Sequence, residues 1–379
     1  MLWKSKECFT LKKISVLLLC TLLFITGCVQ NSNEDEVLQN EETTEEETSI
    51  VPSYQLSDDN YRMILPYKTS EARGVIVNQM ANRVDIDEME EGLRRLSKEV
   101  YDPKELYFQE GQHLDSDTIY KWIDELNPVI EDGAEVETYR ENPRYLSHIL
   151  EQNYMKHNED QSVGLAGISI GIAMKSVYRF QTETGGPYYY EDISQEDMLS
   201  QGNSIAQTIV EEIRQMDGLA EVPIMIALYR EEEQASPVPG NFVAKVNVPG
   251  GSNSVEDWES VNEENILFPS NEGKEKYYDD HEIVTSFGNE IAQFFPNYVG
   301  LIGEGFYIDE ELQKLTIEVP IEFYGKAEIL GFTQYAYGLV QDMFANYFDL
   351  EIKISSSHKL ESLIYRKAGE EAPTVHIFD

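Results

Sequence analysis

The sequence contains little cysteine and little positive charge. Its three cysteines, Cys8, Cys20 and Cys28, all lie near the start of the 379 residues, and 29 lysines and arginines are outnumbered by 70 aspartates and glutamates. Beyond position 28 the chain therefore offers no thiol for a disulfide, for a cysteine-based zinc site or for thiol catalysis. The formal net charge of −41 repels phosphate backbones, so we expect no nucleic-acid partner.

Residues 1–27 have the composition of a secretory leader. Lysines precede an apolar run from Ile14 to Ile25, which is too short to span a bilayer but fits the core of a signal peptide. Residues 23–28 match a bacterial lipobox, in which the leader is cut between Gly27 and Cys28 and the Cys28 sulfur receives a diacylglyceryl group. We therefore expect prolipoprotein-processing enzymes as partners and a lipid anchor at the outer face of the cytoplasmic membrane.

The segment 28–53 reads as a disordered tether. Between 29 and 53 the sequence contains eight acidic residues, no basic residue and no aromatic residue, so it cannot bury enough apolar surface to fold. These differences in composition predict three parts of the chain: the leader 1–27, the acidic tether 28–53 and a folded domain 54–379.

Helical and strand patterns alternate irregularly in the folded part, which favours the α+β class. Helical spacing of apolar residues predicts helices over 87–100, 117–126, 142–155, 205–216, 283–294 and 333–348. Apolar alternation or short apolar runs predict strands over 167–174, 223–229, 241–248, 316–323 and 350–355.

A short internal echo suggests two related halves. The sequence Val-Gly-Leu-Ala-Gly at 163–167 recurs as Val-Gly-Leu-Ile-Gly at 299–303. Each opens a predicted strand, which a polar stretch, an amphipathic helix and a final strand follow. This pattern predicts halves over 54–236 and 237–379, with the boundary near 231–239.

Two motifs in the folded part have a functional and a structural interpretation. Residues 167–171 match the G-x-S-x-G elbow of serine hydrolases, but apolar alternation continues through them, so Ser169 is expected in mid-strand rather than before a helix. Tyr188, Tyr189 and Tyr190 follow a Gly-Gly-Pro turn and are candidate ligand-binding residues for a peptide or glycan. The favoured alternative is that alternate tyrosines of an edge strand pack on the core.

No metal or cofactor motif is expected. The six histidines show no paired metal-ligand spacing, and 279–282 reads as an acidic helix start. The Pro-Gly-Gly-Ser sequence at 249–252 lacks the helix and lysine of a phosphate loop and reads as a turn. We therefore expect no arrangement of catalytic residues, and hence no enzymatic activity.

Several segments carry a resemblance to a known family. They are Tyr61-Arg62, 64–67, 72–74, Gly92-Leu93, 96–98, 109–112, 299–303 and 323–325. On these residues the chain resembles the CamS family of sex-pheromone precursor lipoproteins of Gram-positive bacteria. In that family the end of the leader can be released as a short hydrophobic peptide that is sensed in conjugative plasmid transfer.

The resemblance implies that 21–27 is the corresponding pheromone-like peptide, with a peptide receptor as its partner. It implies no reaction for the mature domain. The alternatives are an extracytoplasmic lipoprotein that binds a peptide or glycan through 188–190, and a surface hydrolase that acts through Ser169.

Overall fold

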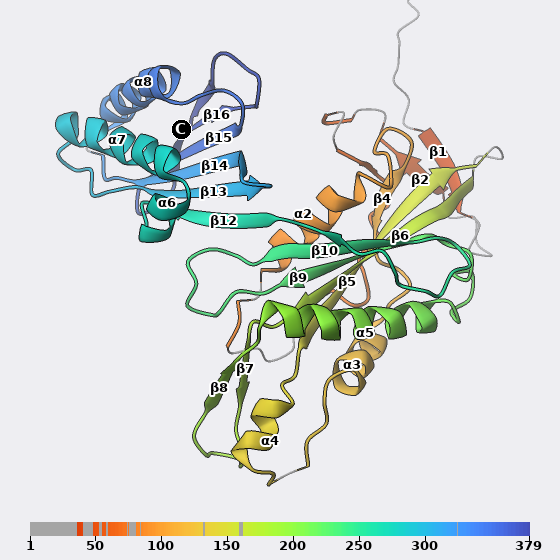
Figure 1. The fold of residues 1–379 in the computed structure, drawn as a ribbon. Helices are drawn as coiled ribbons and strands as arrows, with labels where there is room; N and C mark the ends of the chain where they lie inside the picture. The colour runs from red at the N-terminus through yellow and green to blue at the C-terminus, as the bar shows by residue number, and fades with distance from the viewer. Residues whose placement is uncertain are drawn as a thin grey trace, which may run out of the picture.

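A computed structural model describes residues 36–40, 48–52, 55–57, 60–73, 75, 81–83, 85–131, 133–158, 162–323 and 325–379. The predicted leader, the cleavage site at Gly27 and Cys28, and most of the predicted tether lie outside these residues. The expected mixture of helices and sheets in two halves is confirmed (Figure 1).

The first half is built on a nine-stranded sheet. Its strands, in chain order, are β1 (Glu36–Asn40), β2 (Thr48–Val51), β3 (Arg62–Met63), β4 (Tyr107–Glu110), β5 (Leu146–His157), β6 (Ser162–Met174), β9 (Ile224–Arg230), β10 (Asn241–Val248) and β11 (Glu259–Ser260). The main path runs β11-β10-β9-β6-β5-β4-β3, and β1 pairs with β2 and with β6.

Helices cover both faces of this sheet. α3 (Ser116–Glu125) and α5 (Gln195–Ile213) pack on one face, and α2 (Ile86–Ser97) packs on the other (Figure 1). Strand β9 is buried on both faces. Ile224, Ile226 and Leu228 pack in the core under α3 and α5, while Met225 and Ala227 pack in the core under α2. A strand that is buried on both faces reads as a continuous apolar run.

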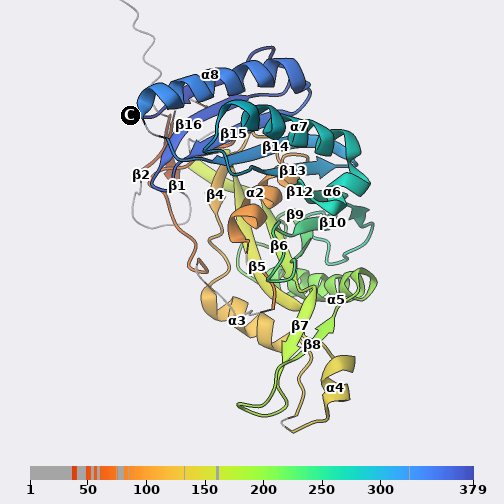
Figure 2. The ribbon, with the colours of Figure 1, turned by 90° about the vertical axis from the view of Figure 1, so that its left-hand side faces the viewer.

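Two smaller elements extend the first half. The helix α4 (Val136–Glu141) precedes β5, and β7 (Val177–Phe180) and β8 (Tyr189–Asp192) form a separate antiparallel hairpin between β6 and α5. Figure 2 shows α4 and this hairpin at the end of the molecule remote from α7 and α8.

The second half is a six-stranded sheet of order β12-β13-β14-β15-β16-β17. Its elements are β12 (Glu263–Phe268), α6 (Asn271–Lys276), α7 (Tyr278–Phe294), β13 (Ile302–Ile308), β14 (Glu311–Pro320), α8 (Lys326–Met343), β15 (Asp349–Ser355), β16 (Leu360–Arg366) and β17 (Thr374–Ile377). The helices α7 and α8 lie on one face (Figure 2), where Phe287 and Phe332 are fully buried. Buried and more exposed side chains alternate along β14, as expected for a sheet with one covered face.

The two halves share one connectivity. The series β4-β5-β6-β9-β10-β11 and the series β12-β13-β14-β15-β16-β17 both pair antiparallel, antiparallel, parallel, antiparallel and antiparallel. A single long helix, α5 or α8, precedes the second strand of each parallel pair, and two helices separate the first two strands of each series. This matching order supports the prediction of two related halves.

The predicted echo and boundary need correction. In the shared connectivity β6 is equivalent to β14, whereas the echo at 163–167 lies in β6 and the echo at 299–303 leads into β13. The boundary at 236/237 falls between β9 and β10, which pair along their whole length. The chain enters the second sheet only between β11 and β12, because the hydrogen-bonded partners of β10 all belong to the first half.

The predicted helix 142–155 is wrong. Residues 146–157 form the central strand β5, which pairs with both β4 and β6. Leu146 and Ile149 join the core under α3 and α5, while Tyr154 joins the core under α2. Because both faces are buried, the apolar residues do not follow a clean two-residue period and also fit helical spacing.

Part of the predicted tether is also ordered differently from expectation. Residues 36–40 and 48–51 pair with each other as β1 and β2, and Gln39 and Asn40 pair with Ser162 and Val163 of β6. Val51 is fully buried with Ile64 and Tyr107. The short apolar pairs of 28–53 therefore lie in strands, within an otherwise acidic sequence.

Polar contacts join α2 to the second half. Arg95 Nη2 lies 3.0 Å from Glu263 Oε2, and its guanidinium lies 4.4 Å from the centre of the Phe306 ring. Asn265 donates to Asn241 across the same boundary at 2.9 Å. The helix α2 thus packs on the first sheet with one side and contacts the second half with another.

Candidate functional site

A cavity of about 200 Å³ in the first half lies on the α2 side of the sheet. It forms where β4 ends, because β4 pairs only with residues 152–155 and leaves the earlier part of β5 without that neighbour. The walls come from α2, from β3 to β5 and from residues 67–73 and 75.

Apolar side chains make up much of the cavity wall. They are Met63, Val75, Ile86, Phe108 and Leu150. On α2 the lining residues Ile86, Glu90 and Arg94 are spaced four apart, so they share one face of the helix. The site is therefore an apolar hollow with charged groups from one helix face at its side.

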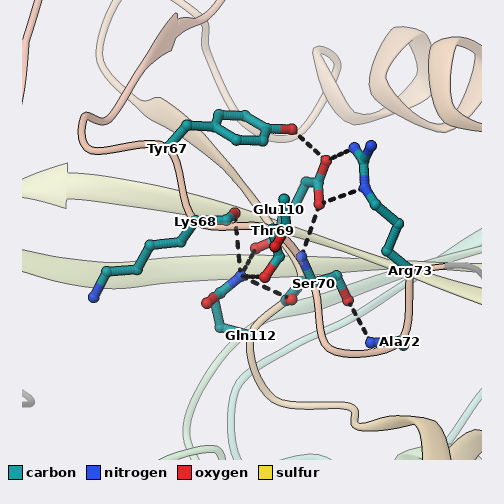
Figure 3. A network of polar contacts seen from close by, with 9 residues as sticks. Tyr67, Lys68, Thr69, Ser70, Ala72, Arg73, Glu110 and Gln112 are labelled. Atoms are coloured by element: carbon teal, nitrogen blue, oxygen red, sulfur yellow. Dashed lines mark hydrogen bonds and ion pairs between the residues drawn. The ribbon is translucent and has the colours of Figure 1, made fainter.

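A polar network ties the segment 67–73 to β4 (Figure 3). The Glu110 carboxylate accepts hydrogen bonds from the Tyr67 hydroxyl, from the Ser70 N–H at 2.8 Å and from the Arg73 guanidinium. Gln112 Nε2 donates to the carbonyls of Glu110 and Gly111 at 3.1 and 3.0 Å. The charge of Arg73 is thereby neutralised within the wall.

The network shifts the ionisation of its members. Burial alone would raise the pKa of Glu110, but the bonds from Arg73, Tyr67 and Ser70 lower it below its ordinary value. Burial and the bond to Glu110 raise the pKa of Tyr67 to about 12. Glu110 is therefore an anion and Tyr67 a neutral donor at pH 7.

Glu151 anchors the other side of the cavity. Its buried carboxylate accepts backbone hydrogen bonds from Gln112, His113 and Leu114, the last at 2.8 Å. A Cβ at Gly111 would lie 2.5 Å from the Glu151 Cβ, so only glycine allows this close approach. Burial raises the pKa of Glu151. We assign this carboxylate a structural role, because its oxygens are occupied by the segment after β4.

Three further lining side chains have no such partners. Arg94 forms no hydrogen bond or ion pair with any residue that the structure describes, and its guanidinium lies 5.6 Å from the centre of the Phe108 ring. Burial raises the pKa of Glu90, against the lowering effects of the Arg73 and Arg94 charges. His148 Nδ1 is buried without a hydrogen-bond partner in the described part of the chain, and burial lowers the pKa of His148 to about 4. The imidazole is therefore neutral at pH 7.

The tyrosines at 188–190 belong to the β7–β8 hairpin, which lies apart from α2 (Figure 1), and none of them lines this cavity. Tyr189 stacks on Phe180 at 5.4 Å between ring centres, whereas Tyr188 and Tyr190 are 51% and 55% exposed. The Arg179 guanidinium lies 4.1 Å from the centre of the Tyr188 ring. Tyr189 thus packs as an alternate residue of an edge strand, and ligand binding by Tyr188, Tyr189 and Tyr190 stays a prediction.

Ser169 lies in the middle of β6, as expected. It is fully buried, and its hydroxyl oxygen lies 2.7 Å from the Ser97 hydroxyl oxygen of α2. The strand continues to Met174 after the motif, so Ser169 is not at the strand-to-helix turn that a nucleophile elbow requires.

The other weighed segments also take structural positions. Residues 279–282 lie in the first turns of α7, and the Asp280 carboxylate accepts from the Tyr307 hydroxyl at 2.8 Å. The Pro249 loop is a turn in which Gly251 has a φ of +76°. Among the described residues no group of three or more His, Cys, Asp or Glu side chains could hold a metal ion.

No helix in the described ranges combines the length and apolar character needed to cross a bilayer. The proposed anchor at Cys28 and the cleavage site at Gly27 are outside those ranges.

Sequence reasoning did not assemble the cavity. Arg73 and residues 109–112 belong to the segments that resemble the family, and Glu90 and His148 belong to no motif that predicted a site. The four-residue spacing of Ile86, Glu90 and Arg94 along α2 was a usable signal, because it places one apolar and two charged side chains on a single helix face.

Comparisons with known proteins agree with this fold. The sequence model of the family described as CamS sex pheromone cAM373 precursor matches residues 67–372. A crystal structure of a sex pheromone precursor from Lactobacillus salivarius is similar at 30% identity and a TM-score of 0.79, covering 87% of this chain and 99% of that one.

A second solved structure is the C-terminal domain of the sex pheromone staph-cAM373 precursor from Staphylococcus aureus. It has 28% identity and a TM-score of 0.67, and the match covers 77% of this chain and 96% of that one. The search among curated proteins found no match.

Proposed function

The chain belongs to the CamS sex pheromone cAM373 precursor family, and from that premise we propose that it is an exported lipoprotein whose leader is a peptide precursor. Lipidation of Cys28 anchors the mature protein at the outer face of the cytoplasmic membrane. Cleavage before Cys28, followed by trimming, releases the segment 21–27 as a signalling peptide for a peptide receptor on recipient cells.

One observation carries the proposal. In a chain of a pheromone-precursor family, an apolar run ends at Gly27-Cys28 in a lipobox pattern, and the residues Thr21 to Gly27 before it carry no charged side chain. A peptide of this composition partitions between membrane and water, as a diffusing signal from a membrane-bound leader must. Two acyl chains on Cys28 provide stable anchoring, whereas one chain binds only marginally.

Mass spectrometry and lipid labelling test this proposal. We expect the 21–27 peptide in the culture medium and radiolabelled palmitate on the membrane form. Cys28→Ala should abolish both signals, while the matched variant Cys20→Ala in the same leader should preserve them. A wild-type medium without the peptide would refute release, and palmitate incorporation into Cys28→Ala would refute the anchor.

A second function is proposed for the folded domain, namely binding of a small ligand. The observation that favours it is the cavity of about 200 Å³ with Arg94 and His148 in its wall. The earlier candidate surface at Tyr188–Tyr190 lies on an exposed hairpin with no comparable enclosure described for it.

The proposal includes no hydrolase activity. This omission is supported by the complete burial of Ser169 and by the short contact of its hydroxyl with the Ser97 hydroxyl. An activity on ester or peptide substrates that is lost in Ser169→Ala would contradict it.

A further inference from the structure

The cavity between α2, β5 and residues 67–73 and 75 contains the guanidinium of Arg94, which has no ion pair within the part of the chain that the structure describes. Among the arginines close to it, Arg73 pairs with Glu110 and Arg95 pairs with Glu263. Arg94 lines the cavity and has no ion pair with any described residue. A guanidinium in this position is suited to a carboxylate, which it can bind through two parallel hydrogen bonds.

Glu90 lies one helical turn before Arg94 on the same helix face. A glutamate four residues before an arginine has the favourable orientation for an ion pair, yet no nitrogen–oxygen distance of 4.0 Å or less joins the charged groups of these two side chains. Both line the cavity instead. A ligand that carries an ammonium beside a carboxylate would pair with Glu90 and with Arg94 at the same time.

The remaining wall selects an apolar body. Met63, Phe108 and Leu150 line the cavity, and burial of a branched aliphatic side chain against them is favourable. His148 adds a neutral imidazole whose buried Nδ1 has no partner within the described chain. A polar atom of the ligand would satisfy this nitrogen, which is otherwise costly to bury.

The charges also exclude some anions. The lining contains the carboxylates Glu90, Glu110 and Glu151 against the guanidiniums Arg73 and Arg94. A phosphate dianion would bring two negative charges into a wall that already contains more acids than bases. The wall therefore disfavours a ligand with a net negative charge.

We propose that this cavity binds a free apolar α-amino acid, with its carboxylate on Arg94, its ammonium on Glu90 and its side chain against Phe108 and Leu150. The inference rests on the ligand-binding function proposed for the folded domain. It is independent of the leader, because none of its residues precedes Met63.

Isothermal titration with three related probes tests the proposal on the full chain in lipid nanodiscs, with empty nanodiscs as the blank. L-leucine has both charged groups, leucinamide lacks the carboxylate and N-acetyl-leucine lacks the ammonium. We expect leucine to bind, and each of the other two to bind at least about tenfold more weakly. No binding of millimolar leucine would overturn the proposal, as would equal affinity for leucine and leucinamide.

Matched variants assign the two contacts. Arg94→Gln should weaken leucine at least about tenfold and remove the preference for leucine over leucinamide. Glu90→Gln should instead remove the preference for leucine over N-acetyl-leucine. Arg140→Gln makes the same change of charge on α4, where Arg140 faces Glu191, and should leave binding unchanged.

Failure of this site and failure of the ligand-binding function are distinguishable. If leucine binds equally to wild type and to a folded Arg94→Gln, as judged by circular dichroism, the domain binds ligand but the assigned site is wrong. If no amino acid binds to the folded wild type, the amino-acid class is wrong. The experiments on Cys28 and on the 21–27 peptide do not depend on either result.

Discussion

Replacement of Glu231 by glutamine should change the pH dependence of stability of the first half. Glu231 follows β9 and is only 3% exposed. One carboxylate oxygen accepts from the Ser147 hydroxyl, and the other has no hydrogen-bond partner among the described residues. Burial raises the pKa of Glu231 to about 7, with Ser147 and Lys175 lowering it and Asp85 raising it.

Proton linkage gives the direction and size of the change in unfolding free energy with pH that Glu231 causes. The ordinary pKa of 4.5 applies to the unfolded chain and the value of about 7 to the folded one. Between these values the folded state holds a proton that the unfolded state has lost, so stability falls as pH rises through the window. The fall amounts to about 3 kcal/mol, from about 1.4 kcal/mol for each pKa unit.

His148 acts in the opposite direction in nearly the same range. Its pKa is lowered from 6.5 to about 4 in the folded state, so its contribution to stability rises with pH between those values. The wild-type profile alone therefore cannot isolate Glu231. The difference between wild type and Glu231→Gln can, because His148 is present in both proteins.

Urea unfolding followed by tryptophan fluorescence is the assay. Trp122, which is fully buried under the first sheet, and Trp258 both belong to the first half, and the second half contains no tryptophan. Relative to wild type, Glu231→Gln should gain about 3 kcal/mol in unfolding free energy between pH 4.5 and pH 7. A difference that is flat across this window would refute the argument that Glu231 is buried as the protonated acid.

Three other predictions concern packing and polar contacts. Leu93→Ala should destabilise the first half by about 2–5 kcal/mol, since Leu93 is fully buried, while Val100→Ala at a 40% exposed position should change urea stability by less than about 0.5 kcal/mol. Glu263→Gln should cost about 1–3 kcal/mol in urea unfolding through loss of the charged contact with Arg95, whereas Glu272→Gln, which removes an exposed pair with Lys276, should be nearly neutral. Arg73→Gln should raise the pKa of Glu110 in NMR titrations and speed exchange of the Ser70 amide, and an unchanged pKa would contradict the network that holds the segment 67–73.

The amphipathic helices were accessible from local pattern. The stripe Met89, Leu93, Leu96 and Val100 predicted a helix over 87–100. The helix α2 spans Ile86–Ser97 with the first three residues buried, whereas Val100 lies beyond its end and is 40% exposed. Strand β10 occupies the predicted range 241–248. These segments have one buried face or a short apolar run, so their spacing indicates the element that forms.

Residues 146–157 show where local pattern is insufficient. As a helix they would bury one stripe, but as β5 they bury both faces and pair with strands from 107–110 and 162–174. Only those partners decide between the two structures. The same applies to the boundary between the halves, because residues 241–248 belong to the first sheet through their pairing with β9.

The sequence by itself determined the export pattern, the absence of thiols beyond Cys28, the excess of acidic residues and the resemblance to the CamS family. Each of these is read from residue types and from short-range order. The tertiary structure decided that β5 is a strand, that the halves divide after β11, and that Arg94, Glu90 and His148 line one cavity. The physical reason is that strand pairing and cavity walls join residues far apart in the chain, and no local spacing records which of them meet.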